Sequence, residues 1–142
     1  MEKIKTPEEI SELLNGNSMD VKDIPSCYFN IEDILVKRKY VHMSIEKTQG
    51  TIHLISIDDT TTDISKTSHL FAQMNLSPII VSILDQKERE EMLEGKSKIV
   101  KIYAGNIQYS ENDFHFDGWS EGLKAYNNRE ITIPVLKKFF NL

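Results

Sequence analysis

Two neighbouring segments with strand-like patterns constrain the fold more than any other feature. Apolar and polar side chains alternate over residues 40–45, and a second extended segment over residues 51–57 follows the polar turn Thr48-Gln49-Gly50. Alternation is typical of a strand with one covered face, and a short polar turn between two strands favours a hairpin. The sequence therefore predicts an antiparallel hairpin of two strands.

The middle of the chain predicts alternating helices and strands. A capped helix is expected over residues 64–75, and the continuous apolar run 78–84 is typical of a strand covered on both faces. A capping box then opens a helix over residues 85–95, and residues 99–103 form another strand. This order predicts a right-handed parallel crossover unit with residues 79–84 and 99–103 as buried parallel strands, so that Val81→Asp would unfold the protein.

The resulting fold prediction is a single α+β domain over residues 1–142, since this length suits one domain. Its mixed sheet joins the antiparallel hairpin to a β-α-β-α-β crossover unit and is packed by helices. The alternative is an α/β flavodoxin-like fold. A helix over residues 1–16 is expected from a Thr6 capping box and a terminating Gly16, and a docked helix over residues 134–142 is expected to begin at Pro134.

Composition narrows the classes of partner. The chain has 17 basic and 22 acidic residues, a net charge of −5, whereas a sequence-independent nucleic-acid binder needs a basic surface. The basic run at residues 37–39 is interpreted as the solvated start of a strand, so nucleic acid is not expected. The single cysteine, Cys27, is interpreted as a small buried thiol. The N-terminus lacks the apolar core of a signal peptide and no apolar run suits a membrane helix, so a cytoplasmic protein is expected.

Motifs for nucleotide binding or catalysis are absent from the sequence. The six glycines are scattered singly, so no phosphate-binding loop is expected, and no GxSxG or zinc-protease spacing occurs. Asp58 and Asp59 are interpreted as residues of a turn and a helix cap. We therefore expect no cofactor, and the missing catalytic signatures favour a protein that is not an enzyme.

The segment Asp113–Trp119 is the most specific candidate site. In an extended segment, Asp113, His115 and Asp117 lie on one face, with two phenylalanines on the other. The three polar side chains could bind a divalent metal, form an acid/base cluster, or simply line the exposed face of a strand. His42 and His53 could also face each other across the hairpin and complete such a metal site.

Trp119 suggests a contact with another protein, because its polar neighbours make full burial hard to arrange and Trp is enriched at interface hot spots. The alternative is that Trp119 caps the edge of its own core. The predicted binding residues are Asp113, His115, Asp117 and Trp119, with no catalytic or metal residue assigned. The predicted function is a non-catalytic protein-binding module, an acidic inhibitor, antitoxin or immunity-type protein whose partner has a basic surface. The alternative is a small metal-dependent hydrolase or nuclease that uses the three β-segment residues. The oligomeric state is not predicted.

Overall fold

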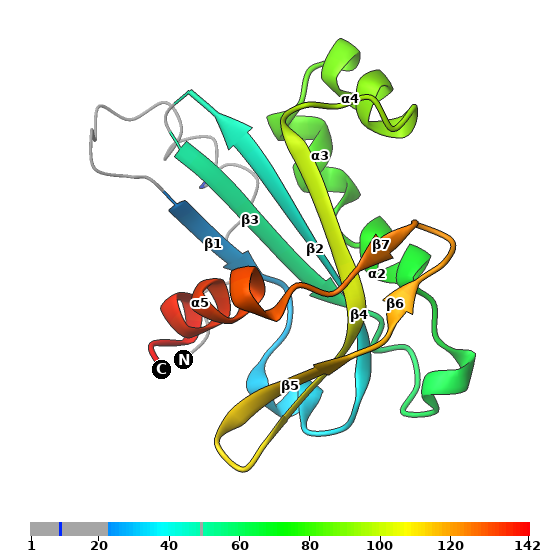
Figure 1. Ribbon diagram of the computed structural model, residues 1–142, viewed down its shortest axis with the longest axis vertical. Coiled ribbons are helices and arrows are strands. Elements are labelled where there is room, and N and C mark those ends of the chain that lie inside the picture. The colour runs from blue at the N-terminus through cyan, green and yellow to red at the C-terminus, as the bar shows by residue number, and fades with distance from the viewer. Residues whose placement is uncertain (1–8, 10–22, 49) are drawn as a thin grey trace.

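A five-stranded mixed sheet forms the centre of the computed structural model, which describes residues 9, 23–48 and 50–142 (Figure 1). The strand order is β1-β3-β2-β4-β5. The strands are β1 (Asp23–Cys27), β2 (Arg38–Lys47), β3 (Gly50–Ile57), β4 (Val100–Ser110) and β5 (Asp113–Asp117). β1 is parallel to β3, and all other neighbours in this sheet are antiparallel. The predicted hairpin is confirmed as β2 and β3.

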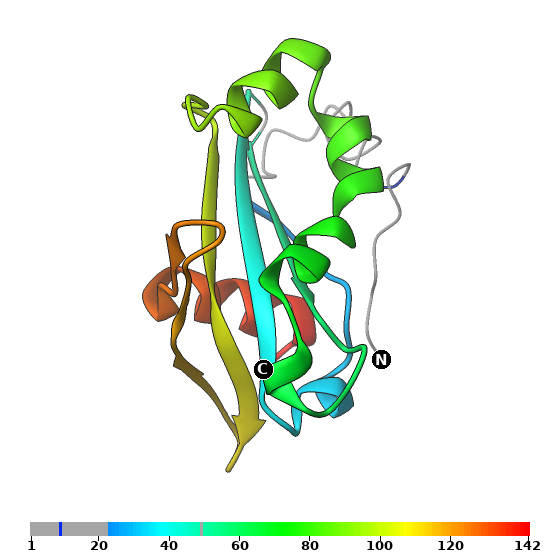
Figure 2. The ribbon, with the colours of Figure 1, turned by 90° about the vertical axis from the view of Figure 1, so that its right-hand side faces the viewer.

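Helices cover both faces of this sheet. One face carries α2 (His69–Met74), α3 (Ser77–Ile83) and α4 (Gln86–Leu93), and the other carries α5 (Arg129–Phe140), as Figure 2 shows. The 3₁₀ helices η1 (Ile31–Ile34) and η2 (Ile64–Lys66) lie in connections. Two short strands, β6 (Trp119–Ser120) and β7 (Ala125–Tyr126), form a separate ribbon next to β4. The helix predicted over residues 1–16 lies outside the described residues, except for Glu9.

The alternation along β2 divides the core into two layers. Met43 and its same-face neighbours pack with Leu76 and Ile80 beneath the helices α2 and α3. Tyr40 packs on the opposite face in a second cluster that includes Leu136 of α5. Because successive side chains of a strand point to opposite faces, both layers follow from one alternating segment.

The predicted strand over residues 79–84 is wrong, because residues 79–83 belong to helix α3 and Leu84 is its C-cap. Ile79, Ile80 and Ile83 are buried, whereas Val81 is 60% exposed. Together with the buried Leu76, these isoleucines follow the i, i+3, i+4, i+7 spacing of a helix with one covered face. Pro78 lies in the first turn of α3, where its missing N–H costs nothing, so it begins a helix here and does not introduce a strand.

The predicted three-strand crossover unit is therefore also wrong. β3 and β4 run in the same direction, since each is antiparallel to β2, but β2 lies between them and η2 and three α-helices connect them. The strand predicted at residues 99–103 exists as the first half of β4, and it pairs with β2 in antiparallel fashion. A flavodoxin-like fold does not fit either, because such a fold needs a parallel sheet and β1–β3 is the one parallel pair in the described sheet.

The local helix signals had mixed outcomes. The predicted capping box of α4 is confirmed, with Asp85 and Glu88 each accepting a backbone hydrogen bond from the other residue. The C-terminal helix α5 begins at Arg129, so that Pro134 lies inside it and does not start it. Its buried Thr132, Val135, Leu136 and Phe139 recur at helical spacing and dock it on the sheet. None of the helices among the described residues is long and apolar enough to cross a membrane.

Candidate functional site

Strand β5 places Asp113, His115 and Asp117 on its exposed face. Phe114 between them is buried, and Phe116 packs edge-on against the ring of Tyr40 at a centroid distance of 5.4 Å. The predicted alternation is confirmed, because β5 pairs with β4 on one side and turns one face to the core.

Asp117 has two side-chain hydrogen-bonding partners, more than are described for Asp113 or His115. Its Oδ2 lies 2.8 Å from Nζ of Lys37, and the side-chain amide of Asn106 donates to its Oδ1 at 2.8 Å. These hydrogen bonds lower the pKa of the Asp117 carboxyl below its usual value. Its negative charge is therefore largely compensated within the molecule.

His115 and Asp113 have partners of their own. Nε2 of His115 lies 3.1 Å from the carbonyl oxygen of Ser110, and Oδ1 of Asp113 accepts a hydrogen bond from the backbone N–H of Phe114. In the part of the chain that the structure describes, no three His, Cys, Asp or Glu side chains are placed to share a metal ion. The three β5 residues thus share a face but do not converge.

The two hairpin histidines do meet, as the sequence suggested. Nε2 of His42 lies 2.9 Å from Nδ1 of His53. Their further partners come from other elements: Oγ1 of Thr132 on α5 lies 2.8 Å from Nδ1 of His42, and Oδ1 of Asp23 on β1 lies 3.1 Å from Nε2 of His53. Four side chains from β1, β2, β3 and α5 therefore form one hydrogen-bonded chain, without any residue of β5.

The chemistry of the end groups sets the direction of this chain. The ionised Asp23 carboxylate can only accept, so Nε2–H of His53 donates to it and Nδ1 of His53 accepts. His42 then donates from Nε2–H, and its Nδ1 accepts from the Thr132 hydroxyl. Every nitrogen has a partner when both rings are neutral.

The pKa values of both imidazoles are lowered accordingly. Burial lowers the pKa of His42 to about 3, and the neighbouring His53 adds to this effect. Burial also lowers the pKa of His53, and the hydrogen bond and charge of Asp23 offset part of that shift.

A pocket of about 230 Å³ opens at the Asp23 end of the chain, lined by Asp23, Pro25, His53, Ile131, Pro134, Val135 and Lys138. It offers no free base, since both nitrogens of His53 are already bonded. Thr132 is fully buried at the other end and cannot meet a substrate. The hydrogen-bonded row of Asp23, His53, His42 and Thr132 therefore has a structural role, because it links α5 to the sheet.

Trp119 is positioned by the corner between β5 and β6. Gly118 has φ of +72°, a conformation that favours glycine, and its carbonyl accepts from the side-chain amide of Asn127 at 2.6 Å. The corner passes so close to β4 that a Cβ on Gly105 would lie 2.7 Å from the carbonyl oxygen of Asp117. Two glycines thus allow the chain to cross β4 and place Trp119 on the outside.

The indole ring of Trp119 stacks on the ring of Tyr126 on the paired strand β7. The ring centroids are 5.2 Å apart and the planes differ by 10°. Trp119 remains 48% exposed and Tyr126 65% exposed. Burial of Trp119 at the edge of its own core is therefore incomplete, and the two rings form a rigid apolar surface that faces solvent. We call Trp119 and Tyr126 the aromatic pair.

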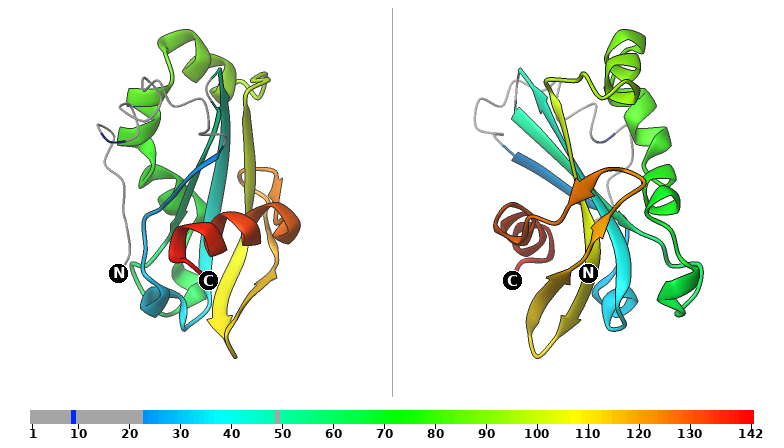
Figure 3. Two further views of the ribbon diagram at one scale, coloured as in Figure 1. Left: turned by 90° about the vertical axis from the view of Figure 1, so that its left-hand side faces the viewer. Right: turned by 45° about the vertical axis from the view of Figure 1, so that its right-hand side comes forward.

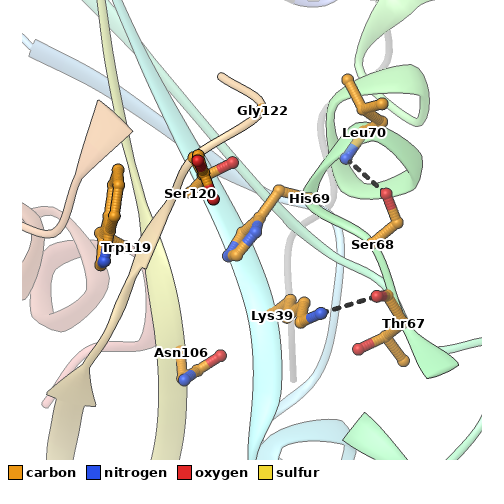
Figure 4. Close-up of a pocket in the computed structure, with 10 residues that line it drawn as sticks. Lys39, Thr67, Ser68, His69, Leu70, Asn106, Trp119, Ser120 and Gly122 are labelled. Atoms are coloured by element: carbon orange, nitrogen blue, oxygen red, sulfur yellow. Dashed lines mark hydrogen bonds between the residues drawn. The ribbon is translucent and has the colours of Figure 1, made fainter. Parts of the chain in front are cut away.

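A shallow pocket of about 330 Å³ lies beside the aromatic pair (Figure 4). In this view Trp119 stands on one side and His69 on the other. Nζ of Lys39 donates to the carbonyl of Thr67 at 2.7 Å, and Nε2 of His69 lies 2.9 Å from the carbonyl of Gly105. The pocket is lined by Lys39, Thr67, Ser68, His69, Leu70, Asn106, Trp119, Ser120, Glu121 and Gly122.

Several of these residues could not be found from the sequence. Tyr126 becomes a partner of Trp119 only through the β6–β7 pairing, and two-residue strands leave no periodic pattern. Asp23 and Thr132 meet the histidines only through the sheet order and the docking of α5.

No family model matches the chain, and no curated protein or solved structure shows a significant match to it.

Proposed function

We propose that this protein is a non-catalytic protein-binding module of the inhibitor, antitoxin or immunity type, and that the aromatic pair is its anchor. The observation that carries the proposal is the exposure of two stacked aromatic rings on one ribbon. Stacking fixes both side chains before binding, so less conformational entropy is lost on association. Trp and Tyr are also the residues most enriched at interface hot spots.

The proposed partner has a basic surface that faces exposed acidic residues of β5 and of the β6–β7 ribbon. Glu121 follows β6 and is exposed, and Asp113 lies exposed on β5. Asp113 has no cation among its described hydrogen-bonding partners, whereas Asp117 is paired with Lys37. Of the two β5 carboxylates, Asp113 is therefore the one whose charge is more available to steer a partner.

The alternative function, a metal-dependent hydrolase or nuclease, has less support. Its three ligands share the exposed face of β5, but each is bonded to a different group. A hydrolytic metal site needs several ligands that converge on one point. We therefore place these residues at the rim of a protein interface.

The proposal is tested by first identifying the partner and then measuring the anchor. A photoreactive amino acid at position 126 would crosslink the partner in cells of the source organism. With that partner purified, Trp119→Ala should weaken binding by about 2 kcal/mol or more, because truncating a hot spot removes buried apolar contact. Val81→Ala, which shortens another exposed apolar side chain, on α3, is the matched control and should bind normally.

Trp119 is the only tryptophan, so its fluorescence reports the site directly. Partner binding should shield the indole from acrylamide quenching, and Asp113→Asn should slow association mainly at low salt. Unchanged affinity of a folded Trp119→Ala variant would rule out the anchor. Turnover of a small substrate by the isolated protein would contradict the non-catalytic assignment.

A further inference from the structure

The edge of β4 is only partly covered by other strands. β2 pairs with Val100–Ile107, but β5 pairs only with Asn106–Ser110 on the opposite side. Within the described ranges, no strand pairs with the segment Val100–Gly105 on the side away from β2. Figure 1 shows this upper part of β4 running past β7 toward α4.

The direction of the backbone groups along this edge follows from one hydrogen bond. The N–H of Glu46 donates to the carbonyl of Ile99 at 2.8 Å, which turns Ile99 toward β2. Backbone groups alternate along an antiparallel pair, so those of Val100 and Ile102 point away from β2. Ser97 already accepts from the N–H of Val100. Ile102 therefore presents both its donor and its acceptor to the open edge.

A groove accompanies this edge. Two adjoining cavities of about 660 and 280 Å³ share five lining residues, Met92, Gly95, Ile102, Leu123 and Lys124. The groove lies between the end of α4 and the loop that joins β6 to β7. In the right-hand view of Figure 3, both segments lie on the same side of β4. The walls of the larger cavity are mostly apolar, so a strand added to β4 could bury every second side chain there.

Exposed lysines lie along the open segment of β4, although Glu94 also lines the larger cavity. Lys98, Lys101 and Lys124 are exposed and form no ion pair with any described acidic residue, whereas Lys96 is paired with Glu94 at 3.3 Å. Lysines on a sheet edge oppose pairing with a second copy, because like charges would meet. They suit a partner that carries acidic side chains.

We propose that the segment Val100–Tyr103 of β4 accepts an extended segment of another protein, with alternating apolar and acidic side chains, as an added strand. Ile102 supplies the backbone hydrogen bonds. The apolar side chains enter the groove beside Met92 and Leu123, and the acidic side chains lie on the opposite face beside Lys101. This site is separate from the aromatic pair and does not depend on the function proposed above.

The test uses a labelled seven-residue peptide of alternating valine and glutamate, with the full-length protein. Fluorescence anisotropy should show saturable binding, and a peptide of alternating valine and lysine should not bind. Amide hydrogen exchange should show new protection of the Ile102 N–H in the complex. The N–H of Tyr103, which faces β2, should exchange equally with and without peptide.

The variants separate charge from backbone pairing. A double variant, Lys98→Glu with Lys101→Glu, should weaken binding of the acidic peptide about tenfold or more. Its control, Lys66→Glu with Lys137→Glu, changes the net charge equally on η2 and α5 and should bind as the parent does. N-methylation of the peptide at alternate residues should abolish binding in one register and leave it unchanged in the other, because only one set of N–H groups can face β4.

Three results would overturn the proposal. These are no binding of the acidic peptide at millimolar concentration, equal binding of the lysine peptide, or equal tolerance of both N-methylated registers. Trp119→Ala should leave peptide binding unchanged. A loss of peptide binding in a folded Trp119→Ala variant would place the peptide at the aromatic pair and remove the β4 site.

Discussion

His42 and His53 form a buried polar contact in which every ring nitrogen has a partner. Their rings share one hydrogen bond, and the outer nitrogens are bonded to Thr132 and Asp23. Burial opposes the addition of a proton to either ring, because the charged imidazolium would lose its solvation. The neutral state of both rings is therefore part of the folded structure.

This arrangement predicts a loss of stability in mild acid. The pKa values of both histidines are lower in the folded protein than in the unfolded chain, so the unfolded chain binds more protons below about pH 6.5. Stability should be complete above that pH and should fall as the pH decreases, with a slope that approaches about 1.4 kcal/mol per pH unit for His42. His53 should add to this fall, since its pKa is lowered in the same direction. For His42 the fall should continue to about pH 3.

Urea unfolding between pH 7.5 and 4.5 measures this slope. His42→Asn should lower stability at neutral pH but flatten the pH dependence, because one buried imidazole is gone. His115→Gln, on the exposed face of β5, is the matched control and should keep the slope of the parent protein. A pH-independent unfolding midpoint for the parent protein would contradict the neutral histidine chain.

Gly105 is required for steric reasons, because the backbone of the β5–β6 corner lies close to it. An added Cβ would lie 2.7 Å from the carbonyl oxygen of Asp117 and 3.0 Å from that of Gly118. Both atoms belong to the backbone and cannot move aside cheaply. Gly105→Ala should therefore destabilise the fold by about 1–3 kcal/mol, measured as a shift of the urea midpoint.

Gly122 provides the comparison for that variant. A Cβ at this position would meet no atom within 4 Å. Gly122→Ala should change stability by no more than about 0.5 kcal/mol. Equal effects of the two substitutions would mean that the β5–β6 corner does not press on β4.

Among the elements, α3 shows how burial and secondary structure are linked. The same apolar run could form a strand with both faces covered or a helix with one covered stripe. As a helix, it leaves Val81 exposed and turns Ile80 into the core. Its C-terminal carbonyls at Val81 and Leu84 accept hydrogen bonds from the side chain of Arg89 on α4, which fixes the turn between the two helices.

The helix predicts opposite outcomes for neighbouring positions. Val81→Asp should be tolerated within about 0.5 kcal/mol, because the new charge is solvated. Ile80→Asp should destabilise the protein by more than about 3 kcal/mol, since it would bury a charge without a partner. Thermal unfolding of the two variants, monitored by circular dichroism, tests this directly. Unfolding of the Val81→Asp variant would instead support the original prediction of a buried strand at residues 79–84.

At the scale of the whole molecule, the net charge is −5, yet exposed lysines lie along the open segment of β4. The function proposed for the aromatic pair needs a basic partner, whereas the site proposed on β4 needs an acidic one. The two proposals therefore predict different partners.

The arrangement of the polar residues on β5 predicts that metal ions do not stabilise the protein. Asp113, His115 and Asp117 are held by separate partners, so millimolar Mn²⁺ or Zn²⁺ should leave the melting temperature unchanged. Differential scanning fluorimetry with and without metal measures this. An increase that His115→Ala abolishes would instead support the hydrolase or nuclease hypothesis.

Local patterns alone were sufficient for part of this structure. The β2–β3 hairpin, the capping box of α4 and the alternation along β5 were all predicted correctly. Each depends on residues that are close in the sequence, where backbone geometry and side-chain direction act directly. The exposure of Trp119 was also suggested by its polar neighbours, although its stacking on Tyr126 was not.

The remaining features were decided by contacts between distant segments. Residues 78–83 form a helix that lies across β2 and β3. One apolar stripe on this helix is enough to cover that face of the sheet. The partners of the two histidines, Asp23 and Thr132, depend on strand order and on where α5 docks. The open edge of β4 likewise results from the length of β5. Propensity and periodicity act over a few residues, whereas burial, pairing and electrostatic contacts are set only when the tertiary structure has formed.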